Sequence, residues 1–200
     1  MFTGIVSDIG TVIARSGARL SIACAYGPAS LEEGASIACD GCCLTVTGFR
    51  AGEGEGAIFD VEVSNETSDC TTAGDWAKGG RINLERSLVL GAELGGHLVM
   101  GHVDGRAKIK DIKVDGESVR VLLEAPPELA HLIASKGSVA LDGVSLTVNE
   151  VNANAFGVNV ISYTLAHTTW GDRVPGDLLN LEIDVLARYV ERIMQRERRS

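Results

Sequence analysis

The sequence predicts an all-β protein of two similar, small closed barrels followed by one C-terminal helix. Three observations carry this prediction. The chain repeats itself over most of its 200 residues. Each copy consists of short strand patterns that turn residues interrupt. The last segment, 185–200, shows a sustained helical spacing of apolar residues.

The repeat is clearest near the end of each copy. Residues 74–85 and 171–182 share the pattern Gly-Asp-x-x-x-Gly-x-x-x-Asn-Leu-Glu, 97 positions apart. At the start of each copy, residues 4–6 match residues 101–103 with the same spacing. Because both ends of the copies agree, a duplication of the whole unit is the simplest explanation.

Alternation is the strand signal within each copy. Phe59, Val61 and Val63 alternate with polar residues, and residues 118–123 repeat this pattern less cleanly. Many short strands in a unit of this size favour a closed barrel, since closure leaves no unpaired sheet edge.

Helices are expected in three places. Residues 31–35 and 126–137 predict one short helix per copy, the second with proline near its start and glycine at its end. The last segment carries its apolar residues on one face: Val185, Leu186, Tyr189, Val190, Ile193 and Met194. No second copy of this helix exists in the chain, so a partner subunit is expected to cover that face.

Composition argues against several classes of function. A formal net charge of −9 disfavours nucleic-acid and anionic-membrane partners, which need a basic surface. No apolar run reaches the roughly 20 residues of a membrane helix. Five cysteines and a start without a signal-peptide pattern predict a cytoplasmic protein. Cys39 and Cys42 have C-x-x-C spacing but no second ligand pair and no following helix, so no metal or redox site is expected.

The second copy explains the adjacent cysteines. The stretch CDGCCLTV at 39–46 recurs as LDGVSLTV at 141–148, and the shift of 102 positions reflects different loop lengths. Alternate residues of a strand share a face, so Cys42 takes the place of a core valine. Cys43 takes the place of Ser145. Thiol and hydroxyl are both polar and nucleophilic, so we expect these two residues to be functional.

Positions that break the repeat indicate where the two copies differ in function. His102 replaces Ile5 and is either a proton-transfer group or a structural histidine. Asp184 replaces Ser87 and either caps the last helix or is catalytic. Lys136 has no basic counterpart. His97 is interpreted as a linker residue and His131 as a surface residue of a helix. His167 could be either structural or functional.

Four motifs together resemble the riboflavin synthase family of the alpha-chain type. They are MFTGIV at 1–6, GCCLTV at 41–46, GGHLVMGH at 95–102 and SLTV at 145–148. Each motif alone is weak, but their order, spacing and duplication are specific, and together they span the chain. Asp40 departs from the pattern, because several relatives have asparagine there.

The resemblance implies a fold and an assembly. We expect two six-stranded Greek-key barrels, over residues 1–94 and 95–184, and an oligomerisation helix over residues 185–200 that forms a homotrimer. It also implies a transferase that dismutates two molecules of 6,7-dimethyl-8-ribityllumazine. The products are riboflavin and 5-amino-6-ribitylaminopyrimidinedione, and no metal or added cofactor takes part.

The resemblance further implies two lumazine pockets, one per copy. The first would use residues from the chain start and from the middle of the first copy: Phe2, Thr3, Gly4, Ile5, Val6, Cys43, Leu44, Thr45, Glu62, Val63, Ser64, Asn65, Glu66 and Thr67. The second would use the equivalent segments of the second copy, with a lysine from a neighbouring subunit: Gly101, His102, Val103, Ser145, Leu146, Thr147, Ile161, Ser162, Tyr163, Thr164, Leu165, Ala166 and Lys136.

The implied reaction needs a proton to leave the 7-methyl group of one lumazine and the second ring to be activated. The catalytic candidates are Cys43, His102, Ser145, Thr147 and Asp184, and the sequence does not choose the nucleophile. The linker at 86–96 is short, so the two barrels should lie side by side. We therefore expect the working site between the first barrel of one subunit and the second barrel of a neighbour.

Two other classes of function remain open. The same double barrel could carry a chromophore without converting it, as in the related lumazine proteins. A flavin-dependent oxidoreductase would need a nicotinamide-binding G-x-G-x-x-G after a strand, and the sequence shows none.

Overall fold

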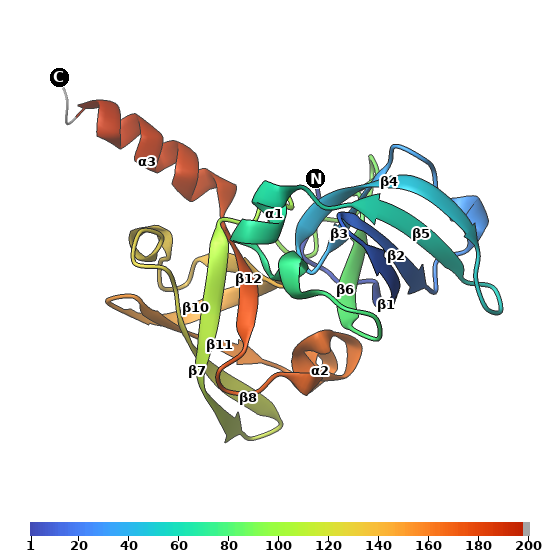
Figure 1. Cartoon of the computed structure of the whole chain (residues 1–200). Coiled ribbons are helices and arrows are strands. Elements are labelled where there is room, and N and C mark those ends of the chain that lie inside the picture. The colour runs from blue at the N-terminus through green and yellow to red at the C-terminus, as the bar shows by residue number, and fades with distance from the viewer. Residues whose placement is uncertain (198–200) are drawn as a thin grey trace.

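The computed structural model describes residues 1–197 and contains two closed antiparallel barrels side by side (Figure 1). The first barrel is closed in the order β1-β2-β5-β4-β3-β6. Its strands are β1 (Asp8–Ser16), β2 (Arg19–Cys24), β3 (Ser36–Cys39), β4 (Cys42–Ala51), β5 (Ala57–Glu62) and β6 (Arg81–Arg86).

The second barrel repeats this topology with the order β7-β8-β11-β10-β9-β12 around the ring. Its strands are β7 (Gly105–Asp115), β8 (Ser118–Glu124), β9 (Ser138–Leu141), β10 (Val144–Asn152), β11 (Ala155–Val160) and β12 (Leu178–Ile183). The predicted all-β architecture of two six-stranded barrels and a C-terminal helix is confirmed.

The predicted strand faces are also confirmed. Along β4, Cys42, Leu44 and Val46 are buried, whereas Cys43 is half-buried and Thr45 is exposed. Burial raises the pKa of the Cys42 thiol to about 12, so this residue is a core side chain rather than a nucleophile.

The predicted short helices are wrong. Residues 31–35 form only a turn, which the 3-10 helix η1 (Pro28–Ser30) precedes, and the range 126–137 contains only the 3-10 helix η3 (Ala130–Leu132). Each barrel instead carries a helix before its last strand, α1 (Asn65–Cys70) and α2 (Ser162–His167). Each of these is followed by a 3-10 turn, η2 (Thr72–Asp75) and η4 (Thr169–Asp172). Six residues give too little periodicity to reveal a helix in the sequence.

The last helix, α3 (Val185–Glu197), extends away from both barrels (Figure 1). The side chain of Asp184, which precedes the helix, accepts a hydrogen bond from the Leu186 amide at 2.9 Å, so of the two roles considered for Asp184 the capping role is confirmed. Residues 198–200 of the predicted helix lie outside the described part of the chain. Within the described residues, no helix is long and apolar enough to cross a membrane.

The barrels contact each other at their two Asp-Gly turns, 40–41 and 142–143, which are related by a local twofold axis. A Cβ atom on Gly41 would lie 2.8 Å from the Gly143 nitrogen, and both glycines have positive φ, so the backbones touch only because neither has a side chain. Asn83 donates its side-chain amide to the Asp142 carbonyl at 2.9 Å, and Asn180 donates to the Asp40 carbonyl at 2.8 Å. These bonds fix the turns that lead into β4 and β10.

One guanidinium serves two buried carboxylates at this interface. Arg173 donates to Asp142 at 2.7 Å and lies 4.0 Å from Asp40. Burial and then the charge of Asp142 raise the pKa of Asp40 well above its usual value. Burial also raises the pKa of Asp142 to about 6, although Arg173 opposes that shift. The interface therefore favours holding at least one of the two acids protonated.

Candidate functional site

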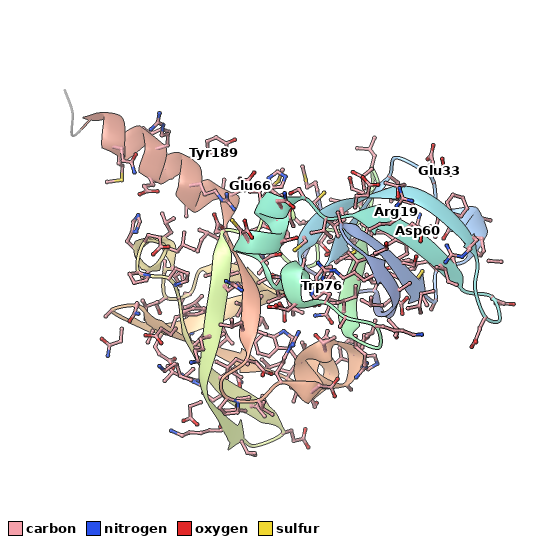
Figure 2. All side chains as sticks on the ribbon, viewed as in Figure 1. Arg19, Glu33, Asp60, Glu66, Trp76 and Tyr189 are labelled. Atoms are coloured by element: carbon pink, nitrogen blue, oxygen red, sulfur yellow. The ribbon has the colours of Figure 1, made fainter. Side chains whose placement is uncertain are left out.

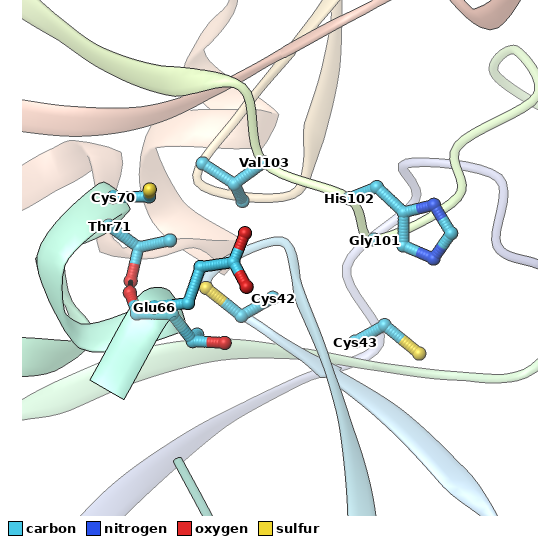
Figure 3. A pocket seen from close by; sticks show the side chains of 9 residues that line it. Cys42, Cys43, Glu66, Cys70, Thr71, Gly101, His102 and Val103 are labelled. Atoms are coloured by element: carbon cyan, nitrogen blue, oxygen red, sulfur yellow. Dashed lines mark hydrogen bonds between the residues drawn. The ribbon is translucent and has the colours of Figure 1, made fainter. Parts of the chain in front are cut away.

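The first candidate pocket lies beside α1 in a cavity of about 200 Å³ (Figure 3). One wall comes from β4 and α1 of the first barrel, and the other comes from the segment that leads into the second barrel. The lining residues are Cys42, Cys43, Glu66, Thr67, Cys70, Thr71, Gly101, His102 and Val103. Cys43 and His102, two of the predicted catalytic residues, thus line the same cavity.

This geometry corrects the expected grouping of segments. Residues 101–103 belong to the first pocket, because the Cys43 amide donates to the Gly101 carbonyl at 2.8 Å and Val103 packs on the first barrel's core. Reciprocally, the Ser145 amide donates to the Gly4 carbonyl at 2.8 Å, and Val6 packs on the second barrel's core. Each barrel is therefore completed by the leading segment of the other.

Two buried glutamates hold these crossed segments in place. Glu182 accepts hydrogen bonds from the amides of residues 100, 101 and 102 at 2.6, 2.9 and 3.0 Å. Glu85 accepts from the Thr3 amide and hydroxyl, both at 2.7 Å, and from the Gly4 amide at 2.9 Å. Burial raises the pKa of both carboxyls, and the hydrogen bonds oppose that shift. Neither glutamate was predicted to be functional, although both stand in the repeated Asn-Leu-Glu motif.

The second candidate pocket is placed at Ser145, because this residue is the counterpart of Cys43, and Ser145 there forms a pair that the sequence did not predict. His97 Nδ1 lies 2.7 Å from the Ser145 hydroxyl oxygen. Its Nε2 is buried and has no partner among the described residues. Burial lowers the pKa of His97, so the ring is neutral near pH 7 and can accept the serine proton. His97 is thus part of the candidate site and not simply a linker residue.

The helices of the two pockets differ in character. Glu66 and Cys70 of α1 face the first pocket, and 97 positions later α2 carries Tyr163 and His167. The rings of Tyr163 and His167 are stacked with centroids 4.0 Å apart, and Tyr163 is 67% exposed. The first pocket is therefore acidic and thiol-rich, whereas the corresponding helix of the second copy carries a stacked aromatic pair.

Several predicted binding residues can offer a ligand only backbone atoms. Phe2 is fully buried between the barrels, and Leu44, Val63 and Leu146 are buried in the barrel cores. The side chains of Ser64 and Glu62 are exposed but already have partners: Ser64 caps α1 by accepting from the Thr67 amide at 3.0 Å, and Glu62 pairs with Arg19 at 3.0 Å. Others are exposed and free to meet a ligand: Ile5, Thr45, Asn65, Lys136, Thr147, Ile161, Ser162 and Ala166.

The remaining predicted residues are placed as follows. Thr164 and Leu165 of α2 are half-buried. Asp184 lies close enough to His97 for its charge to oppose the lowering of the histidine pKa. His131 is exposed and contacts Glu191 of α3 at 2.6 Å. Within the described residues, no group of three or more His, Cys, Asp or Glu side chains could hold a metal ion.

Comparison with known proteins gives consistent results. The model of the lumazine binding domain matches the chain twice, at residues 3–87 and 100–184. A riboflavin synthase of Brucella abortus (strain 2308) is 54% identical over 199 residues, which cover 98% of each chain. A riboflavin synthase of Mycobacterium tuberculosis (strain H37Rv) is 40% identical over 202 residues, again 98% of each chain.

Solved structures share the fold. The crystal structure of LumP complexed with riboflavin has a TM-score of 0.77 and 24% sequence identity, and the match covers 92% of this chain and 99% of that one. The LumP complex with 6,7-dimethyl-8-(1'-D-ribityl) lumazine has a TM-score of 0.74 and 23% identity over the same shares.

Proposed function

Because the chain belongs to the riboflavin synthase family, we propose that it joins two molecules of 6,7-dimethyl-8-ribityllumazine across its two pockets. Its activity is that of a transferase in riboflavin biosynthesis. One lumazine gives a four-carbon unit to the other, and the products are riboflavin and 5-amino-6-ribitylaminopyrimidinedione. The presence of two similar but unequal pockets in one chain carries this proposal, since two identical substrates must take different roles.

The second pocket is proposed to activate the accepting ring. The Ser145 hydroxyl adds to a ring carbon while its proton passes to His97 Nδ1, 2.7 Å away. A neutral histidine suits this role, because burial lowers the pKa of His97. Thr147 lies on the same face of β10 as Ser145 and can orient the lumazine ring. Asp184 lies near His97 and can orient the imidazole.

The first pocket is proposed to bind the donor, whose 7-methyl group must lose a proton. His102 is the proton-transfer group, because it lines the cavity beside Cys43 and is exposed to an incoming ligand (Figure 3). Glu66, Thr67 and backbone atoms of residues 101–103 surround the same cavity and can fix the ligand's polar edge. Holding both rings in a reactive arrangement would lower the barrier by about 7–11 kcal/mol.

The two pockets are proposed to face each other across neighbouring chains. Among the described residues, the lining of the first pocket includes neither Ser145 nor any residue of α2, so one chain does not enclose both rings there. Five large apolar residues of α3 are exposed by 48–68%: Leu186, Tyr189, Val190, Ile193 and Met194. Tyr189 projects from it into solvent (Figure 2). We propose that other copies of the same chain cover this apolar face.

Several finer points rest on the family resemblance. The assembly would be a homotrimer in the cytoplasm, with Lys136 reaching the second pocket from a neighbour. The chain would divide into barrels at 1–94 and 95–184 and a helix at 185–200. Because the leading segments cross over, neither barrel unit would have a complete pocket without the other.

Incubation of the purified protein with 6,7-dimethyl-8-ribityllumazine alone tests the proposal. Riboflavin should appear at half the rate at which lumazine disappears, because two substrates give one riboflavin. Ser145→Ala serves as the matched variant that keeps the fold. The similarity to the lumazine-binding LumP structures favours one alternative, a carrier. Tight binding of lumazine by the wild-type protein, without any riboflavin, would support the carrier and refute the enzyme.

A further inference from the structure

The C-terminal helix is bonded directly to the backbone of the residue that carries the proposed proton-transfer group. Arg188, on the first turn of α3, donates from Nη2 to the His102 carbonyl at 2.7 Å. The same nitrogen donates to the Asp104 carboxylate, also at 2.7 Å. Asp104 in turn accepts from the Ile183 amide at 2.8 Å, at the end of β12. Helix, strand end and pocket segment thus share one charged cluster.

The first copy of the repeat lacks this arrangement. The residues 97 positions before Asp104 and Arg188 are Ser7 and Gly91. Ser7 bonds to the Tyr26 hydroxyl at 2.7 Å instead. The leading segment of the first copy is therefore held by Glu85, whereas the segment carrying His102 has Glu182 and also a contact from α3. The additional contact from Arg188 is thus made to His102, the residue that replaces Ile5 of the first copy.

Apart from Arg188, α3 has few contacts that set its direction. Ala187 packs on the second barrel's core, and Glu191 bonds to the exposed His131. The larger apolar side chains of the helix face solvent in the single chain. A partner that covers them would set the direction of the helix, and Arg188 would transmit that direction to the His102 carbonyl, on the segment whose amides Glu182 holds.

We propose that Arg188 is a positioning residue that couples assembly through α3 to the placement of His102 in the first pocket. This inference rests on the proposed function, in which His102 transfers a proton and copies of the chain cover α3. A shift of the pocket segment would move the imidazole relative to the bound ring while leaving the remaining lining in place. Turnover should therefore suffer more than substrate affinity.

The test compares four variants with the wild type: two that remove the contact, one conservative replacement of Arg188 and one control. Arg188→Ala removes the contact but leaves the half-buried Asp104 carboxylate without its cationic partner. The double variant Asp104→Ser/Arg188→Ala removes the contact and the charge together, and it reproduces the serine of the first copy. Glu191→Ala is the control, because it breaks the other polar contact of α3 and lies outside both pockets. Each variant is assayed under conditions in which light scattering shows that its assembly has the same mass as that of the wild type.

The double variant should lose about 10- to 100-fold in kcat, the scale of a misplaced catalytic group. Its KM should change less than about threefold, and the control should stay within about twofold of the wild type. Arg188→Lys should recover part of the loss, because an ammonium can still donate to one of the two acceptors. Lumazine fluorescence measures binding to every variant independently of turnover.

Three results would overturn the proposal. A double variant with wild-type kcat would mean that Arg188 only neutralises Asp104. A variant that never reaches the wild-type size would assign Arg188 to assembly itself. Equal losses in kcat for the double variant and the Glu191 control would point to general loosening of α3. An inactive wild-type protein would instead refute the proposed function, which distinguishes the two failures.

Discussion

Replacing Asp40 by asparagine should stabilise the fold at neutral pH. Asp40 and Asp142 are both buried, and Arg173 bonds closely to Asp142 alone. Ionising both acids would leave a net negative charge in the interface, so the fold retains a proton that the unfolded chain releases. An asparagine retains the oxygen that accepts from the Asn83 amide at 2.7 Å and carries no charge.

The size of the effect follows from the direction of the pKa shift. The pKa of Asp40 is raised in the fold, so its stabilising contribution is complete below pH 4 and is lost as pH rises. Each pH unit over which the folded chain keeps this proton lowers the free energy of unfolding by about 1.4 kcal/mol. Asp40→Asn has no carboxyl group at this position, so this part of the pH dependence of stability disappears. The difference in stability between variant and wild type should therefore grow from pH 5 to pH 7, by at most about 2.8 kcal/mol over these two pH units.

Urea unfolding at pH 5, 6 and 7 measures this difference directly. Asp115→Asn is the matched control, because it makes the same chemical change at an exposed hairpin position. Its stability should run parallel to that of the wild type across the pH range. Parallel curves for Asp40→Asn as well would refute the argument, because they would mean that Asp40 binds no extra proton in the folded chain.

Three further predictions concern the site and the assembly. Cys43→Ala should lower turnover at least about tenfold with the fold intact, whereas Cys42→Ala should cost about 1 kcal/mol of stability and little activity; equal activity losses in two folded variants would contradict this. His97→Ala should lower kcat at least about 100-fold if it takes the Ser145 proton, and an unchanged kcat would remove it from the mechanism. Deleting residues 186–200 should convert the assembly into smaller species by light scattering, and a full-sized assembly would place the helix within its own chain.

The sequence predicted the features that depend on local periodicity. Alternation identified the buried face of β4 because one side of that strand faces the barrel core, and Cys42 follows that rule as Val144 does in β10. It missed α1 because a six-residue helix of polar sequence, NETSDC, has no apolar stripe. Capping was one of the two roles expected for Asp184, and the sequence could suggest it because that role depends on neighbouring residues only.

The rest of the site depends on contacts between distant segments. The repeat shows that residues 4–6 correspond to residues 101–103, but correspondence does not say which barrel each segment contacts. The exchange became visible only in the hydrogen bonds from Cys43 and Ser145 to the opposite segments. His97 was missed for a related reason: a position 97 residues earlier does not exist, so the repeat offers nothing with which to compare it.

The central claim is that one reaction needs the first pocket of one chain and the second pocket of its neighbour. Mixing Cys43→Ala chains with Ser145→Ala chains, after subunit exchange verified by mass, tests it most directly. In a cyclic assembly one in four neighbouring pairs should unite two intact pockets, so activity should rise to about a quarter of the wild-type value. Exchanged assemblies that stay as inactive as either parent would contradict the claim and place both working pockets within one chain.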